Sequence, residues 1–230
     1  MTIKAVFFDA GHTILYPDPP VGEIYAREAA RLGARVPADR IAPLFYEEFK
    51  AFMATYAQGA ASDEQDRAMW RGITRRVYER VPEFAAFDFE TWFARLYDAF
   101  GHAAVWRLYE DVEPALAMLR ARGMRLGIIS NWDKRLRTIV REMGLDAIFD
   151  RVTISSEEGV RKPNPVIFER ALAGLGVRAE EALHVGDLVE DDIAGARAAG
   201  LRGVLVDRGR FAMPEGVPVV RDLREIASTL

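Results

Sequence analysis

The stretch Ala5–Thr13, with the sequence AVFFDAGHT, decides the fold because a short apolar run ends within it at a carboxylate. Val6, Phe7 and Phe8 show no polar alternation. They therefore predict a strand that is covered on both faces, as in a parallel sheet with helices above and below. Asp9 follows directly. Open α/β sheets bind their ligands at the carboxyl ends of the strands, so we expect Asp9 at a ligand-binding edge.

Beyond residue 110, short apolar runs alternate with segments of helical periodicity. Strands that alternate with helices predict a doubly wound parallel α/β sheet. The expected strands cover 126–130, 152–155, 182–186 and 204–207, and the expected helices cover 115–122, 136–143, 166–175 and 193–199.

Residues 16–110 have a different character and interrupt this pattern after its first strand. Three prolines between positions 17 and 20 favour a linker. Four stripes of helical periodicity follow, around 21–32, 41–53, 69–77 and 89–100, and this region holds 18 of the 24 aromatic residues. We therefore predict an inserted α-helical domain over 16–110 with its own core. The sheet domain then comprises 1–15 and 111–230.

Composition bounds the remaining possibilities. The chain has 230 residues, no cysteine and a formal net charge of -4, with no block of like charge. Disulfides, thiolate nucleophiles and cysteine-ligated zinc are thereby excluded. The balanced charge argues against nucleic-acid and membrane-surface partners. The N-terminal apolar run is too short for a signal peptide or a spanning helix, so the expectation is a cytoplasmic protein. The oligomeric state is left open.

Several polar residues follow the predicted strands or lie close to them in the expected fold. Parallel strands end at one edge of the sheet, so these residues should converge although they are distant in sequence. Each one also fits a plain structural role, such as a turn, a helix cap or a solvated surface lysine, and only their joint position favours a site. The set is Asp9, Ser130, Asn131, Lys162, Asp187, Asp191 and Asp192.

This combination suits a phosphate monoester. The phosphate dianion repels an attacking carboxylate, and a hard divalent ion such as Mg²⁺, bound by oxygen ligands, neutralises both. Asp9 and Asp187 are the candidate metal ligands. Asp191 or Asp192 would order the waters of the metal ion or bond Lys162.

The remaining groups complete a reaction. Ser130 and backbone N–H groups would bind the phosphoryl oxygens, and Lys162 would stabilise the charge that develops on them. Asp9 is then left as the nucleophile that forms an acyl-phosphate.

With these residues the chain resembles the haloacid dehalogenase (HAD) superfamily, in the branch with a helical cap inserted after the first motif. The residues that carry the resemblance form four motifs in order. They are Asp9 to Thr13, then Ile128 to Asn131, then Lys162 to Pro165, and finally Val185 to Asp192 with Gly195-Ala196 and Ala199-Gly200.

The resemblance implies a Rossmann-like sheet and a small phosphorylated substrate. It also implies Mg²⁺ bound by Asp9, the backbone carbonyl of Gly11 and Asp187, with Asp192, or alternatively Asp191, as a further metal residue. Asp9, Lys162 and Ser130 are the expected catalytic residues. The expected substrate-binding residues are Ser130, Asn131, Lys162 and Thr13.

One position departs from the pattern. Family phosphatases usually carry a second Asp two positions after the nucleophile, which protonates the leaving oxygen, whereas this chain has Gly11. Loss of a general acid/base typically costs about 10²–10⁴-fold in rate. The chain resembles a phosphatase-like branch with the same substitution. Two alternatives stay open: a 2-haloacid dehalogenase, and a catalytically weak binding or regulatory protein with this fold.

Overall fold

The computed structural model describes residues 2–55, 60–210 and 216–230. The chain forms two compact units, each described here by itself. The first comprises Met1–Tyr16, Gln58–Ser62 and Leu108–Leu230, and the second comprises Pro17–Ala57 and Asp63–Arg107. The described residues 60–62 group with the sheet unit, although they lie within the range 16–110 predicted for the helical domain. Within that segment, Ala60 forms a bridge with Val160, and the Ala61 N–H donates to the Gly159 carbonyl at 3.1 Å.

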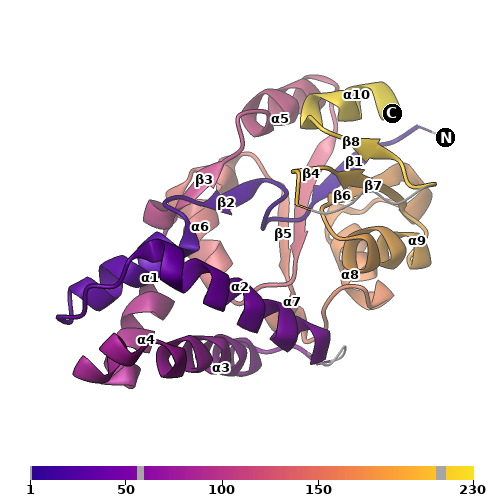
Figure 1. The fold of residues 1–230 in the computed structure, drawn as a ribbon. Helices are drawn as coiled ribbons and strands as arrows, with labels where there is room; N and C mark the ends of the chain where they lie inside the picture. The colour runs from indigo at the N-terminus through magenta and orange to yellow at the C-terminus, as the bar shows by residue number, and fades with distance from the viewer. Residues whose placement is uncertain (1, 56–59, 211–215) are drawn as a thin grey trace. The chain divides into compact units, whose positions relative to one another are not determined.

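Among the described residues, the sheet unit contains six strands in the order β5-β4-β1-β6-β7-β8, all of them parallel to their neighbours (Figure 1). This confirms the predicted doubly wound α/β sheet. The bounds are β1 Ala5–Phe8, β4 Arg125–Ser130, β5 Arg151–Ile154, β6 Ala182–Gly186, β7 Arg202–Val206 and β8 Val219–Val220.

Helices flank this sheet. Crossovers between parallel strands are as a rule right-handed, and with this strand order the rule puts α5 and α6 on one face and α8 and α9 on the other (Figure 1). Asn164 and Pro165 start α8, where the Asn164 side chain accepts from the Val166 N–H, and Gly176 ends it with a left-handed φ of 60°. The bounds are α5 Val112–Ala121, α6 Arg135–Glu142, α7 Ser155–Glu158, α8 Pro165–Leu175, α9 Gly195–Ala198 and α10 Ile226–Thr229.

The register of the central strands aligns the polar residues that follow them. All four residues of β1 are buried, as the unbroken apolar run predicted. Phe8 pairs with Ile128 on β4 and with Val185 on β6. Asp9, Ser130 and Asp187 all lie within two positions of this row, so the three residues leave the sheet at the same edge.

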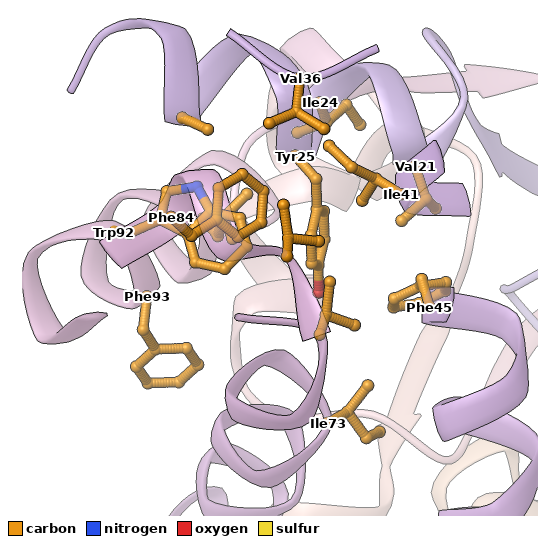
Figure 2. Packing of buried hydrophobic residues seen from close by; sticks show 14 of the residues in the cluster. Val21, Ile24, Tyr25, Val36, Ile41, Phe45, Ile73, Phe84, Trp92 and Phe93 are labelled. Atoms are coloured by element: carbon orange, nitrogen blue, oxygen red, sulfur yellow. The ribbon is translucent and has the colours of Figure 1, made fainter. Parts of the chain in front are cut away.

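The second unit contains the four predicted helices, α1 Val21–Ala30, α2 Ala38–Thr55, α3 Asp63–Arg80 and α4 Phe89–Ala99. Their inward faces build one apolar core in which Trp92 and Phe84 are fully buried. Figure 2 shows the Tyr25 side chain among Val36, Ile41 and other members of this cluster. The prediction that the aromatic residues of this region fill a core is confirmed.

Some elements differ from the prediction. The proline-rich segment expected as a linker contributes strand β2 (Leu15–Pro17), which pairs with β3 (Trp106–Leu108) where the chain leaves and re-enters the sheet unit. The helix expected from residue 193 is preceded by a π-helical segment, Val189–Ala194. These short strands carry too little alternation to be recognised, and the π-helical turn has no period of its own in the sequence.

In the part of the chain that the structure describes, none of the helices has both the length and the apolar character needed to cross a bilayer.

Candidate functional site

Asp9, Ser130 and Lys162 meet at the carboxyl edge of the sheet. The Ser130 hydroxyl donates to Asp9 Oδ1 at 2.9 Å, and Lys162 Nζ donates to the same oxygen at 2.7 Å. The Asp9 and Lys162 side chains are 11% and 2% exposed, respectively. Burial raises the pKa of Asp9 above its ordinary value, although the neighbouring Lys162 and Ser130 lower it. Three residues that are up to 153 positions apart therefore form one buried cluster.

Lys162 also reaches a second carboxylate. Lys162 Nζ donates to Asp192 Oδ1 at 2.5 Å, and the fully buried His184 places Nε2 2.9 Å from the same oxygen. Burial lowers the pKa of Lys162, but the charges of Asp192 and Asp9 outweigh it and raise the pKa overall. For Asp192, burial raises the pKa, but Lys162 and His184 hold it below its usual range. The ammonium group thus bridges two carboxylates.

Gly186 makes room for this arrangement. A Cβ atom at Gly186 would lie 2.0 Å from Asp192 Cγ, a distance that no side chain tolerates. The Leu188 N–H donates to Asp192 Oδ2 at 3.0 Å, which fixes the carboxylate against the end of β6. The glycine before Asp187 is therefore required for the close approach of Asp192 to the sheet edge.

Asn131 holds the backbone of Lys162 from both sides. Its Oδ1 accepts from the Lys162 N–H at 2.8 Å, and its Nδ2 donates to the Lys162 carbonyl at 3.0 Å. Nδ2 also donates to Asp191 Oδ2 at 3.3 Å. Both polar atoms of Asn131 are thus engaged in positioning Lys162 and Asp191, and direct phosphoryl binding by this side chain stays a prediction.

Asp187 lies in the same cluster and has a partner that the sequence reasoning missed. Arg210 Nη1 donates to Asp187 Oδ2 at 2.6 Å, with the Arg210 side chain 30% exposed. Burial and the charges of Asp9 and Asp192 raise the pKa of Asp187 to about 7. Burial also raises the pKa of Asp191 to about 6, with the Asp192 and Asp9 charges adding to the effect.

After burial, an excess of negative charge is the second reason for the raised pKa of Asp187. Among the described residues that interact in this cluster, four carboxylates (Asp9, Asp187, Asp191 and Asp192) face two cations, Lys162 and Arg210. The formal sum is -2, so a divalent cation would neutralise the cluster and relieve the repulsion that raises the pKa of Asp187.

The donor set also fits such an ion. Within the described ranges, no three His, Asp or Glu side chains form a ready metal cage. Mg²⁺ does not need one, because it commonly binds one or two carboxylates and keeps several waters. Asp9, Asp187 and the carbonyl of Gly11 offer oxygen atoms of the right chemistry.

Two neighbours of Gly11 are less clearly part of the cluster. Thr13 is fully buried, and its hydroxyl has no hydrogen-bond partner among the described residues. Among the described residues, no hydrogen bond joins Thr13 to Asp9 or Lys162, so the role of Thr13 in substrate binding stays a prediction. His12 has a φ of 56°, and burial together with the Arg210 charge lowers its pKa to about 4.

The sequence analysis did not predict two side chains of the cluster, Arg210 and His184, although their positions in the chain pointed to the site. Arg210 follows β7, so the same rule that brought Asp9 to the sheet edge applies to its loop. His184 lies within a predicted strand, where its ring nitrogen is directed to Asp192. Periodicity identifies the buried face but not which buried polar groups pair.

Comparison with known proteins identifies the family. The family model for haloacid dehalogenase-like hydrolases matches residues 3–200. The chain belongs to the haloacid dehalogenase-like hydrolase family, so it is a hydrolase of this class, as the resemblance predicted.

Individual relatives extend this result. The chain is 34% identical over 218 residues to a glyceraldehyde 3-phosphate phosphatase of Methanopyrus kandleri, covering 91% of this chain and 86% of the relative. It is 38% identical over 181 residues to a phosphoserine phosphatase of Thermus thermophilus, covering 76% and 73%. Among solved structures, a 2-haloacid dehalogenase from Pseudomonas syringae pv. Tomato superposes with a TM-score of 0.62 at 26% identity, covering 99% and 97%.

Proposed function

We propose that the protein hydrolyses a small phosphate monoester with Mg²⁺, through an aspartyl-phosphate on Asp9. The observation that carries this proposal is the buried contact of Asp9 Oδ1 with Ser130 and Lys162, at 2.9 and 2.7 Å. A carboxylate beside a hydroxyl and an ammonium group is a nucleophile placed next to two donors for phosphoryl oxygens. The excess negative charge of the cluster supports the metal requirement.

The proposed reaction has two displacements at phosphorus. An Asp9 oxygen attacks the phosphorus atom, the ester P–O bond breaks, and the alcohol leaves with a proton taken from water. A water molecule then attacks the aspartyl-phosphate, the bond between phosphorus and Asp9 breaks, and inorganic phosphate leaves. Ser130 and Lys162 hold the phosphoryl oxygens in both steps.

The metal ion has one task in this scheme. Bound by Asp9, the Gly11 carbonyl and Asp187, Mg²⁺ would neutralise the carboxylates and the phosphoryl group as they approach. Asp192 holds the Lys162 ammonium in place through their 2.5 Å contact, and His184 holds Asp192. The second-motif Asn131 fixes the backbone from which Lys162 extends.

Two relatives named as phosphatases, for glyceraldehyde 3-phosphate and phosphoserine, support a small phosphorylated substrate. Dehalogenation is the second candidate, because a haloacid dehalogenase shares the fold. The carboxylate-rich cluster around Asp187 favours the phosphatase, because its excess negative charge suits a reaction that uses a divalent cation.

Phosphate release from a panel of monoesters, with Mg²⁺ and with a chelator, tests the proposal. We expect release only with Mg²⁺, and none from Asp9→Asn. Asp146→Asn is the matched control, because Asp146 is exposed on a short 3-10 helix and takes no part in the cluster.

Release that survives chelation, or that survives Asp9→Asn, would overturn the mechanism. Halide release from a 2-haloacid without metal would assign dehalogenation instead. Tight ligand binding without turnover of any compound would assign a binding or regulatory protein.

A further inference from the structure

The aromatic side chain of Trp132 lies close to Gly11. A Cβ atom built on Gly11 would lie 3.3 Å from Cζ3 of Trp132, closer than side-chain carbons normally approach. Trp132 follows Ser130 and Asn131, the residues that contact Asp9 and Lys162. The indole therefore faces the position two residues after the proposed nucleophile.

The backbone of Trp132 is firmly held. Its N–H donates to the Ser155 hydroxyl at 3.1 Å, and its carbonyl accepts from the same hydroxyl at 3.1 Å and from the Ser156 N–H at 3.2 Å. On its two sides, Asn131 is bonded to Lys162 and the buried Asp133 accepts from the Arg135 N–H. With its main chain fixed at these points, the indole can leave Gly11 only by changing its side-chain rotamer.

A carboxyl side chain at position 11 needs more room than a Cβ atom alone. Its first carbon would already be in close contact with the indole, so Trp132 would have to shift before an acid could be accommodated at position 11. Gly11 supplies no acid, and Trp132 lies against the position from which an acidic side chain would extend.

We infer that Gly11 and Trp132 together determine the specificity of the site: Gly11 supplies no acid, and Trp132 lies against the position from which an acid at residue 11 would extend. Efficient turnover is thereby restricted to phosphate compounds whose leaving group departs without a proton. Acyl phosphates, which are mixed anhydrides, meet this condition best, and among the monoesters of the proposed function the aryl esters of acidic phenols meet it. This inference rests on the proposed function, because it concerns the leaving group that Asp9 displaces.

The chemistry balances without an acid. An Asp9 oxygen attacks the phosphorus of an acyl phosphate, the P–O bond to the acyl group breaks, and the electron pair leaves with a carboxylate that is stable unprotonated. Water then attacks the aspartyl-phosphate, the electron pair returns to the Asp9 carboxylate, and the protons of the water go to phosphate and solvent. An alkyl phosphate would instead expel an alkoxide, for which the missing acid costs about 10²–10⁴-fold.

The test is the dependence of kcat/KM on leaving-group basicity. Acetyl phosphate, a series of aryl phosphates and glycerol phosphate are assayed with Mg²⁺ on the wild-type protein, Gly11→Asp, Trp132→Ala and the double variant. Thermal unfolding with and without Mg²⁺ verifies that each variant folds and binds metal. Trp132→Phe, alone and combined with Gly11→Asp, provides a second pair of variants in which the indole is replaced by a smaller aromatic ring.

We expect kcat/KM to fall steeply as the leaving group becomes more basic, both in the wild-type protein and in the single variants Gly11→Asp and Trp132→Ala. In the double variant an acid has room, so the dependence flattens and the rate on glycerol phosphate rises by about 10²-fold. A flat dependence in the wild-type protein, or a Gly11→Asp variant that flattens it alone, overturns the inference. The inference is also overturned if the double variant folds and binds Mg²⁺ but its kcat/KM depends on leaving-group basicity as steeply as that of the wild-type protein. Failure of the proposed function is distinguished separately, by phosphate release from Asp9→Asn.

Discussion

The two units differ in how they pair their buried charges. The sheet unit buries Asp9, Lys162 and Asp192 almost completely at one strand edge. The helical unit has an interior of aromatic and aliphatic side chains (Figure 2) and places pairs such as Arg40 with Glu83 on its surface. Its buried Glu28 pairs with arginines that are themselves 56% and 39% exposed. Burial of a charge costs free energy that only a specific arrangement offsets, so the constraint is stronger in the first unit, where the cation and both carboxylates are buried.

The largest effect is expected where a buried charge loses its partner. Lys162→Met leaves Asp9 and Asp192 buried without the ammonium group that bridges them. We expect the free energy of unfolding to fall by about 3–5 kcal/mol and Mg²⁺-dependent turnover to disappear. Urea unfolding and phosphate release measure the two effects.

Lys50→Met, at an exposed position of α2, is the control and should leave both measurements unchanged. If the Lys162→Met protein were as stable and active as wild type, the buried ion pairs of the sheet unit would contribute no more than exposed charges do.

A smaller effect is expected in the core of the helical unit. The Tyr25 hydroxyl lies 3.1 Å from Thr74 Oγ1, and both residues are buried. Tyr25→Phe keeps the ring and removes this partner of Thr74, which should lower the free energy of unfolding by about 1–3 kcal/mol. The double variant with Thr74→Val removes both polar groups and should recover part of the loss. A single variant without any cost would show that this hydrogen bond does not contribute.

The smallest effect is expected at the surface. Arg40 and Glu83 form an exposed pair at 2.5 Å, in which the hydrogen bond from Arg40 holds the pKa of Glu83 below its usual range. Exposed pairs of this kind are screened by solvent and salt. Arg40→Ala should leave the urea midpoint within experimental error at physiological salt. A clear loss of stability would mean that the exposed charges matter as much as the buried ones.

The sequence predicted the parts of the molecule that depend on local pattern. The apolar run before Asp9 predicted a strand buried on both faces, and the convergence of strand ends predicted that Asp9, Ser130 and Lys162 would meet. Helical stripes rich in aromatic residues predicted the second core. In each case the pattern is repeated over several positions, so that burial and register follow from it.

What the sequence did not predict depends on close packing between distant segments. The contact of Arg210 with Asp187 depends on the path of the loop after β7, and the approach of Trp132 to Gly11 depends on the turn after β4. Neither path is encoded by a periodic pattern. The pairing of β2 with β3 was missed because three-residue strands are too short to show alternation.

The central claim is that Asp9 carries the phosphoryl group, and mass spectrometry after an acid quench tests it most directly. The protein is mixed with acetyl phosphate and Mg²⁺, quenched during turnover and digested. We predict a phosphorylated peptide that contains Asp9, absent from the Asp9→Asn variant and absent when Mg²⁺ is chelated. Phosphorylation at another residue, or steady turnover in which the Asp9 peptide is never phosphorylated, would contradict the claim.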